Sequence, residues 1–275
     1  MPTELLNGVR LHYDIVGTGD TVVLTHGSWG DGDGWQPTTD VLSRTHRVVT
    51  WDRRGHSRSE GGDGPGSIMQ DVDDLTALIE HIDDGPVHAV GNSYGAVITY
   101  ALAGARPDHV RSAAVHEPPV LGLLESSTDP DVQAVADPFF AHMNTVKSLL
   151  EQGKNHDAPK HFVDYIVYGP GAWDSFPQES MDALARNAPT FLDELQSQPY
   201  GHIDLDALAN SGVPLLLTVG TKSPPFLKLI VGMLDDLVPP IRVEWIDGAD
   251  HLPHAGLPEE WSAVLRNFWD QVRQA

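Results

Sequence analysis

The segment from Val90 to Gly95 constrains the fold more than any other part of this sequence. It reads Val-Gly-Asn-Ser-Tyr-Gly, with a glycine two residues before and another two residues after Ser93. An apolar run that begins at Val87 precedes it and a helix-like run follows it, so it predicts a tight strand-to-helix turn. The glycines are expected because a side chain would collide where strand and helix almost touch. Such a turn holds its central serine strained and exposed, as a nucleophile.

Short strand-like runs alternate with helical patterns on both sides of this turn. Residues 21–25 and 46–51 read as buried strands, and residues 67–82 carry apolar side chains at helical spacing. Further along, strand-like runs at 214–220 and 242–246 each precede a helical pattern. This alternation predicts an α/β protein with a doubly wound, mainly parallel sheet that is covered by helices on both faces.

The middle of the chain breaks the alternation. Residues 121–207 contain helix-like segments, such as 131–153 and 177–195, and need no strand. We therefore expect one core domain, formed by residues 1–120 and 208–275. The expected helical cap, residues 121–207, would be inserted over the carboxyl edge of the sheet.

His251 is the expected general base for Ser93. It lies in a loop after the last predicted strand, and a loop at that edge can bring an imidazole to the serine hydroxyl. The chain has 14 histidines, so most of them must serve other purposes. The nearest alternative is His254, which is better interpreted as the start of the following loop.

The carboxylate that would orient His251 is missing from its usual place in the chain order. The loop after the penultimate strand, residues 220–224, reads Gly-Thr-Lys-Ser-Pro and holds no acid. Glu117 ends the strand that follows the serine turn, and neighbouring parallel strands end at the same edge, so we predict Glu117 as the acid. Its other interpretation is a cap for the segment entering the insertion. Asp250 adjoins the histidine and would rarely reach the far ring nitrogen, and Asp247 is a weaker alternative still.

The loop at residues 26–30, which reads His-Gly-Ser-Trp-Gly, is expected to stabilise an oxyanion. It follows a buried strand and offers the backbone N–H of Ser28, and also that of Gly27. The second donor would be the N–H of Tyr94 at the start of a helix, where the helix dipole also favours negative charge.

Four apolar side chains are candidates for substrate binding: Trp29, Trp173, Leu121 and Phe226. Trp173 follows Gly-Pro-Gly, which favours a functional role, whereas the other three could equally pack in a core. The charged turn at residues 52–59 is interpreted as structural, because Arg and Asp can satisfy loop carbonyls there.

The charge of the chain limits its partners. A formal net charge of −22 argues against nucleic acid and anionic membranes, and it disfavours strongly anionic substrates. The absence of cysteine excludes thiol chemistry and disulfides. The first residues resemble no signal peptide and no run is long enough to span a bilayer, so we expect a cytoplasmic protein. No metal and no cofactor are implied, and a homodimer is compatible with the sequence.

These motifs together resemble the α/β-hydrolase fold superfamily over essentially the whole chain. A narrower similarity is to the lactonases that open zearalenone, a resorcylic macrolactone. That similarity implies a glutamate acid at position 117 and a cap tryptophan at position 173. Haloalkane dehalogenases share the acid position, but their nucleophile is an aspartate. The narrower similarity rests on His116-Glu117-x-Pro, Gly55-x-Ser57-Arg58-Ser59 and Val219-Gly220-x-x-Ser223-Pro224.

The sequence thus predicts a serine hydrolase with a Ser93-His251-Glu117 triad. Its expected substrate is a small, largely apolar carboxylic ester or lactone, including a zearalenone-like macrolactone. Two alternatives stay open. One is a different activity of the same triad, such as C–C bond hydrolysis or cofactor-free perhydrolysis. The other is a hydrolase-fold binding protein with little turnover.

Overall fold

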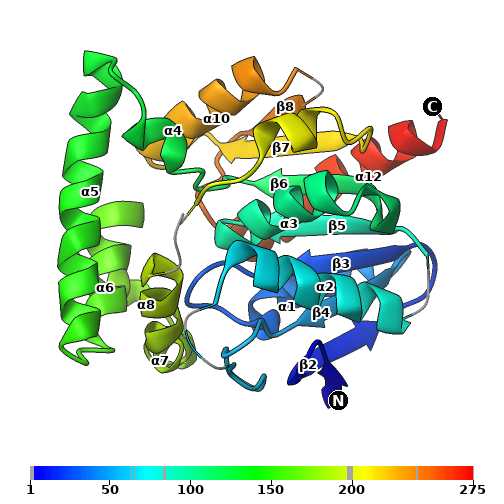
Figure 1. Ribbon diagram of the computed structural model, residues 1–275, viewed down its shortest axis with the longest axis horizontal. Coiled ribbons are helices and arrows are strands. Elements are labelled where there is room, and N and C mark those ends of the chain that lie inside the picture. Colours follow the sequence, from blue (N-terminus) through cyan, green and yellow to red (C-terminus); the bar gives the residue numbers. More distant parts are fainter. Residues whose placement is uncertain are drawn as a thin grey trace.

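A single sheet runs through the centre of the protein (Figure 1). This computed structural model describes residues 3–62, 64, 66–82, 85–196, 201–239 and 241–274; residues 197–200 of the predicted cap lie outside it. In this described part, eight strands pair in the order β1-β2-β4-β3-β5-β6-β7-β8. The strands are β1 (Thr3–Leu6), β2 (Val9–Val16), β3 (Thr21–Thr25), β4 (Arg47–Trp51), β5 (Val87–Asn92), β6 (Val110–His116), β7 (Leu215–Gly220) and β8 (Ile241–Ile246).

The sheet is mainly parallel, as predicted. Strands β4, β3, β5, β6, β7 and β8 all pair in parallel, whereas β1 and β2 form an antiparallel hairpin at the edge beside β4. Every residue of β3, β5 and β7 is buried, which explains their continuous apolar runs. Strand β1 was not predicted, because three of its four residues are exposed and it lacks such a run.

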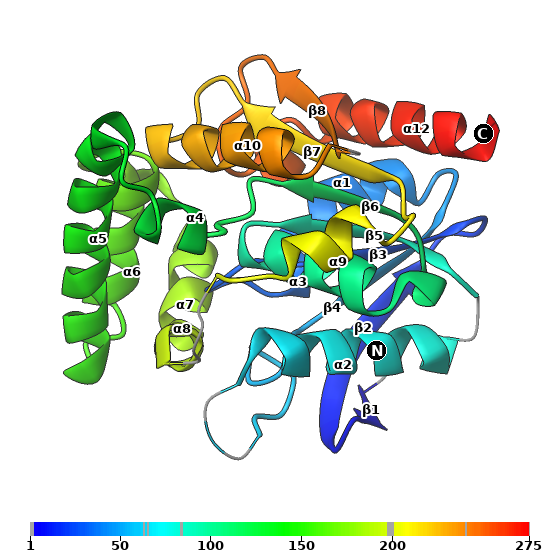
Figure 2. The ribbon, with the colours of Figure 1, turned by 45° about the horizontal axis from the view of Figure 1, so that its top comes forward.

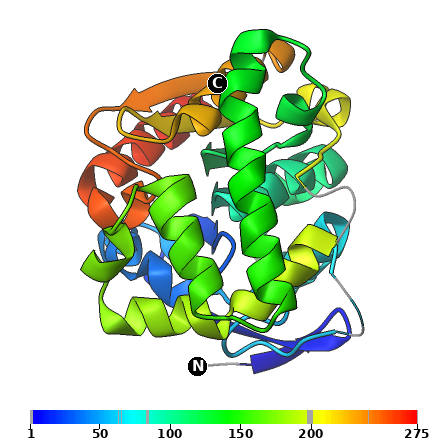
Figure 3. The same ribbon diagram turned by 90° about the vertical axis from the view of Figure 1, so that its left-hand side faces the viewer.

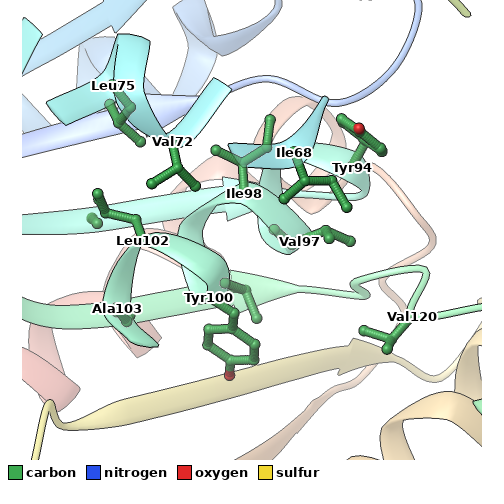
Figure 4. Close-up of a cluster of buried hydrophobic side chains, with 14 of the residues drawn as sticks. Ile68, Val72, Leu75, Tyr94, Val97, Ile98, Tyr100, Leu102, Ala103 and Val120 are labelled. Carbon is green, nitrogen blue, oxygen red and sulfur yellow. The ribbon is translucent and has the colours of Figure 1, made fainter. Parts of the chain in front are cut away.

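Helices cover both faces of the sheet (Figure 2), so the doubly wound fold class is confirmed. On one face lie α2 and α3, with Val72 of α2 beside Ile98 of α3 in one apolar cluster (Figure 4). On the other face α1 packs against α12, and Trp261 and Leu265 of α12 contact the opposite side of the strands. The core helices are α1 (Gln36–Leu42), α2 (Ile68–Ile82), α3 (Tyr94–Ala105), α9 (Leu205–Ala209), α10 (Pro225–Leu237), α11 (Pro253–Gly256) and α12 (Pro258–Gln274), with short turns η1 (Gly32–Trp35) and η2 (Pro107–His109).

From α4 to α8 the described chain is mainly helical and stands beyond the carboxyl edge of the sheet (Figures 1 and 3), whereas α9, which also precedes β7, packs on α3 (Figure 2). The segment at 177–195 was expected to be continuous, but it breaks at Asn187, whose buried side chain bonds to the core instead. None of the described helices is both long and apolar enough to cross a membrane. The helices of this insertion are α4 (Gly122–Glu125), α5 (Pro130–Glu151), α6 (Asp157–Phe162), the π-helix η3 (Val163–Val167), η4 (Ala172–Ser175), α7 (Gln178–Arg186) and α8 (Ala188–Gln196).

Candidate active site

Ser93 lies in a strained turn between β5 and α3. Its backbone has φ 55° and ψ −126°, a region that side-chain-bearing residues rarely adopt. A Cβ on Gly91 would lie 2.2 Å from the carbonyl oxygen of Gly95, and one on Gly95 would lie 2.2 Å from that of Thr25. No larger residue fits at either glycine, and the Ser93 N–H is held by the carbonyl of His116 at 3.0 Å. The local sequence therefore forces the serine to the tip of the turn.

The loop at residues 26–30 runs directly alongside this serine. A Cβ on Gly27 would lie 2.9 Å from the Cβ of Ser93. The loop is anchored by His26, whose Nδ1 donates to the carbonyl of Gly27 at 2.8 Å while its Nε2 accepts the backbone N–H of Arg53 at 2.9 Å. Burial, assisted by the nearby guanidinium, lowers the pKa of His26 to about 4, so the ring is neutral at pH 7. This anchoring brings Ser28 beside the serine, where α3 begins.

Glu117 and His251 meet at the same edge of the sheet. His251 Nδ1 and Glu117 Oε2 are 2.7 Å apart. The other carboxylate oxygen, Oε1, accepts the backbone N–H of Gly220 at 2.9 Å and lies 3.3 Å from His116 Nε2. Glu117 itself is fully buried and has φ 50°, so the chain turns sharply where β6 ends. The His251 ring is therefore held through Nδ1, and it lines the same cavity as Ser93.

The surroundings of Glu117 keep it ionised. Burial by itself would raise the pKa of this carboxyl group. The His116 and His251 rings, by charge and by hydrogen bonding, outweigh burial and hold the pKa of Glu117 well below its usual range. An ionised carboxylate at Nδ1 favours the His251 tautomer whose Nε2 can accept a proton.

The alternative acids and the alternative base lie elsewhere. Asp250 Oδ1 accepts the backbone N–H of Leu252 at 2.9 Å, and Asp247 contacts the hydroxyl of Thr221. The ring of His254 packs 4.4 Å from that of Trp35. In the described part of the chain, the carboxylate bonded to the His251 ring is that of Glu117.

A narrow, apolar cavity of about 20 Å³ lies over the serine. Of the four predicted substrate-binding residues, Leu121 and Phe226 line it. A volume of this size holds about one water molecule, so a substrate enters only if cap side chains move. The lining residues are Ser28, Ser93, Pro119, Leu121, Phe139, Met143, Phe162, Val167, Phe226, Leu227 and His251.

Trp29 and Trp173 are not among these lining residues. Trp29 is 3% exposed and packs against the rings of Phe162 and Phe191, with centroids 5.5 and 4.2 Å away. Trp173 is 2% exposed, and its backbone N–H is held by Asp164 inside the cap. The structure therefore does not place these two indoles at the cavity, where they were expected to contact substrate. Both pack inside the cap or at its junction with the core.

Several of the residues that line the cavity were not identified from the sequence. Phe139 and Met143 are one helical turn apart on α5, Phe162 is the last residue of α6, and Val167 is the last residue of the π-helix η3. Their helical spacing could have identified an apolar face. It could not have shown that this face looks onto Ser93, because that depends on how the cap seats on the sheet.

The charged turn at residues 52–59 has the structural role that its composition indicates. Asp52 is fully buried and accepts hydrogen bonds from the backbone N–H of Gly32 at 2.8 Å and from the guanidinium of Arg58 at 2.7 and 2.8 Å. Among the residues that the structure describes, no three His, Asp or Glu side chains gather as a metal site.

Comparison with known proteins gives the family. RutD of Azorhizobium caulinodans, named as a carbamate hydrolase, is 24% identical over 281 residues and aligned over 100% of both chains. YraK of Bacillus subtilis (strain 168), an uncharacterized hydrolase, is 35% identical over 122 residues, or 44% of this chain; the match spans less than half of that relative, 45%. A carboxylesterase structure from Nitrososphaera gargenis has a TM-score of 0.77 at 21% identity, covering 99% of this chain and 98% of that one.

A family profile also matches most of the chain, residues 22–264. The profile begins within strand β3 and ends within helix α12, so it contains the serine turn, the cap and the histidine loop. By this match, and by its strand order and helical layers, the protein belongs to the alpha/beta hydrolase family.

Proposed function

We propose that this hydrolase cleaves uncharged carboxylic esters or lactones through a Ser93-His251-Glu117 triad. The observation that carries the proposal is the 2.7 Å bond between His251 Nδ1 and Glu117. The same histidine lines a cavity together with the strained serine. A nucleophile, a base and an orienting acid in this relation are the requirements of acyl transfer.

In the first half-reaction, Ser93 Oγ attacks the carbonyl carbon while His251 Nε2 takes the hydroxyl proton. The developing oxyanion is stabilised by the backbone N–H of Ser28, with that of Gly27 in support, and by that of Tyr94. The imidazolium formed on His251 is stabilised by the ionised Glu117. When the tetrahedral intermediate collapses, His251 gives its proton to the leaving alkoxide, and the acyl group stays on the serine.

In the second half-reaction, water replaces the alcohol. His251 Nε2 removes a proton from the water as its oxygen attacks the acyl-enzyme carbonyl. Collapse of the second intermediate returns the proton to Ser93 Oγ and releases the carboxylic acid. For a lactone, both products are ends of one molecule, a hydroxy acid.

The lining of the cavity supports an uncharged, apolar substrate. Apart from the catalytic serine and histidine and the hydroxyl of Ser28, every lining residue is apolar. A charged acyl or alcohol group would lose hydration there without a partner. The net charge of −22 adds repulsion for anions.

The lactone form of the substrate, including a zearalenone-like macrolactone, is the finer part of the proposal. It is supported by the sequence resemblance at Glu117 and at the turn around Ser57. A macrocycle is far larger than the cavity, so its hydrolysis requires the cap to open further than a short ester would demand. Carbamates belong in the same assay, because their carbonyl would be attacked in the same way and RutD is named for that substrate class.

The test is turnover by wild type and by Ser93→Ala. We expect wild type to release p-nitrophenol from a short aryl ester, and Ser93→Ala to lose roughly 10³-fold or more in kcat with its fold intact. A fluorophosphonate should label Ser93. Labelling of another residue, or wild type without turnover on esters, lactones and carbamates, would contradict the proposal and favour a binding protein.

A comparison of kcat/KM between ester and lactone substrates distinguishes a general esterase from a lactonase. A higher kcat/KM on zearalenone than on a linear aryl ester of similar size supports the finer proposal, and the reverse leaves a general esterase. Phe226→Ala and Trp173→Ala are the matched pair, because only Phe226 lines the cavity. We expect Phe226→Ala to change the ratio between the two substrates and Trp173→Ala to change both rates together.

A further inference from the structure

A buried cluster of charges lies where cap helix α8 meets the core. The Arg53 guanidinium donates to Glu194 Oε1 at 2.8 Å and to the two carboxylate oxygens of Asp71 at 3.3 and 3.2 Å. Arg53 follows β4, Asp71 lies in α2 and Glu194 lies in α8, so three separate elements meet. All three residues are buried. A buried ion pair adds little folding stability compared with well-packed apolar residues. The effect of this cluster therefore lies in which neighbouring groups it holds in place.

The cluster contacts both residues that would stabilise the oxyanion. Ser28 Oγ donates to the second oxygen of Glu194 at 2.5 Å, and Ser28 also lines the cavity. The guanidinium carbon of Arg53 lies 4.6 Å from the centre of the Tyr94 ring, within cation–π range. The backbone N–H of Arg53 holds the His26 ring at the start of the oxyanion loop.

A second cap side chain holds the same loop. Asn187 lies between α7 and α8 and donates its NH₂ group to the carbonyl oxygens of Trp29 at 3.0 Å and Gly30 at 2.9 Å. Trp29 has φ 68°, a strained conformation that persists only where the surroundings hold it. Three successive residues of the loop, from Ser28 to Gly30, therefore accept or donate a hydrogen bond with a cap side chain.

We propose that Glu194 and Arg53 are positioning residues that make the oxyanion hole depend on the seating of the cap. The bond from Ser28 to Glu194 holds the loop in place only while α8 lies against the core. Because the cavity is too small for a substrate as it stands, the cap must shift on entry, and its return restores the loop around the bound ester. This coupling rests on the proposed function for its catalytic consequence.

The experiment compares Ser28→Ala, Glu194→Leu and the double variant with Asp74→Asn. Leucine is chosen because a glutamine at position 194 could still donate a hydrogen bond to the Ser28 hydroxyl. The control neutralises another fully buried carboxylate, that of Asp74 in α2, which pairs with Arg54 at 2.5 Å. Its hydrogen bonds go to Asn7 and Arg54 and not to the loop at residues 26–30. Three assays are run: steady-state kinetics (kcat and KM) on an aryl ester, the Kd of an arylboronic acid, and hydrogen exchange of the peptide that contains residues 26–30. Melting temperatures report on folding. If Glu194→Leu does not fold, Ser28→Ala removes one oxygen atom and still breaks the bond to Glu194.

We expect Ser28→Ala and Glu194→Leu each to lower kcat about 10- to 100-fold with KM within threefold, and the double variant to be no worse than either. The boronic acid, which mimics the tetrahedral intermediate, should bind more weakly by a similar factor. Hydrogen exchange of the loop should rise tenfold or more, whereas Asp74→Asn should leave the values from all three assays within threefold of wild type. Additive effects in the double variant, unchanged loop exchange, or equal losses in Asp74→Asn would overturn the coupling. Loop exchange needs no turnover, so it decides the coupling even if the proposed hydrolysis fails.

Discussion

Replacing Glu117 by glutamine should inactivate the enzyme through the tautomer of His251. The glutamate Oε1 accepts the N–H of Gly220 at 2.9 Å and lies 3.3 Å from His116 Nε2, both on the side away from the base. A glutamine keeps its carbonyl oxygen on that side, so its NH₂ group must face His251 Nδ1. Nδ1 then becomes an acceptor and Nε2 carries the proton, which prevents it from deprotonating the serine.

The size of the effect follows from this geometry. An amide in place of the orienting carboxylate of a serine triad costs about 10⁴-fold in kcat, or about 5 kcal/mol at 1.36 kcal/mol per tenfold change. Glu117→Ala offers no NH₂ group, so the ring can keep the productive tautomer with water as its partner. We therefore expect Glu117→Gln to be at least as impaired as Glu117→Ala.

The assay is kcat and kcat/KM on the best aryl ester, with melting temperature as the check on folding. Asp250→Asn is the matched control, because Asp250 is the acid nearest to the base in sequence and its Oδ1 bonds to the backbone of Leu252 instead. It should change kcat by less than fivefold. A rate for Glu117→Gln within tenfold of wild type, or a 10³-fold loss in Asp250→Asn, would refute the reasoning.

Three further outcomes follow from the structure. Gly27→Ala should lower kcat at least tenfold with little change in melting temperature, because the added Cβ would lie 2.9 Å from the Cβ of Ser93. Phe226→Leu should raise kcat/KM on octanoyl relative to butyryl aryl esters severalfold, because it widens the cavity; an unchanged ratio would exclude this lining role. Burial, with Arg111 nearby, lowers the pKa of His88 to about 4. Below pH 6.5 the unfolded chain therefore takes up a proton that the folded ring does not, so the fold loses about 3 kcal/mol of stability as pH falls from 6.5 towards 4. Urea unfolding at pH 7 and pH 4.5 should therefore show a smaller acid loss in His88→Asn than in wild type.

The core of the fold could be predicted because its signals are local. Strand β3 has the predicted bounds, since a strand buried on both faces must be continuously apolar, and helix α3 follows the serine turn as predicted, since the glycines of that turn mark where the helix starts. The edge strand β1 has neither signal. The break between α7 and α8 is also not local, because Asn187 leaves the helix to bond with Trp29, Gly30 and Ser57.

Substrate-facing side chains were harder to predict than the triad. Aromatic residues serve a core and a pocket equally well, so Trp29, Trp173 and Phe226 could not be told apart by type. Their assignment depends on how α5, α6 and α8 seat against the sheet. That seating buries both tryptophans and leaves Phe226 stacked on Phe139 at the cavity.

The sequence by itself determined the α/β alternation, the strained serine and a short set of partners for it. It excluded an acid in the loop at 220–224 and left Glu117, Asp250 and Asp247 as candidates. Only the tertiary structure decided which of them meets His251, because the contact joins residues 134 positions apart. It depends on the parallel pairing of β6 with β7 and on the loop after β8, which together bring the ends of distant strands to one edge. The bonds from the cap to the oxyanion loop arise in the same way, since Ser28 and Glu194 are neighbours only when the cap lies on the core.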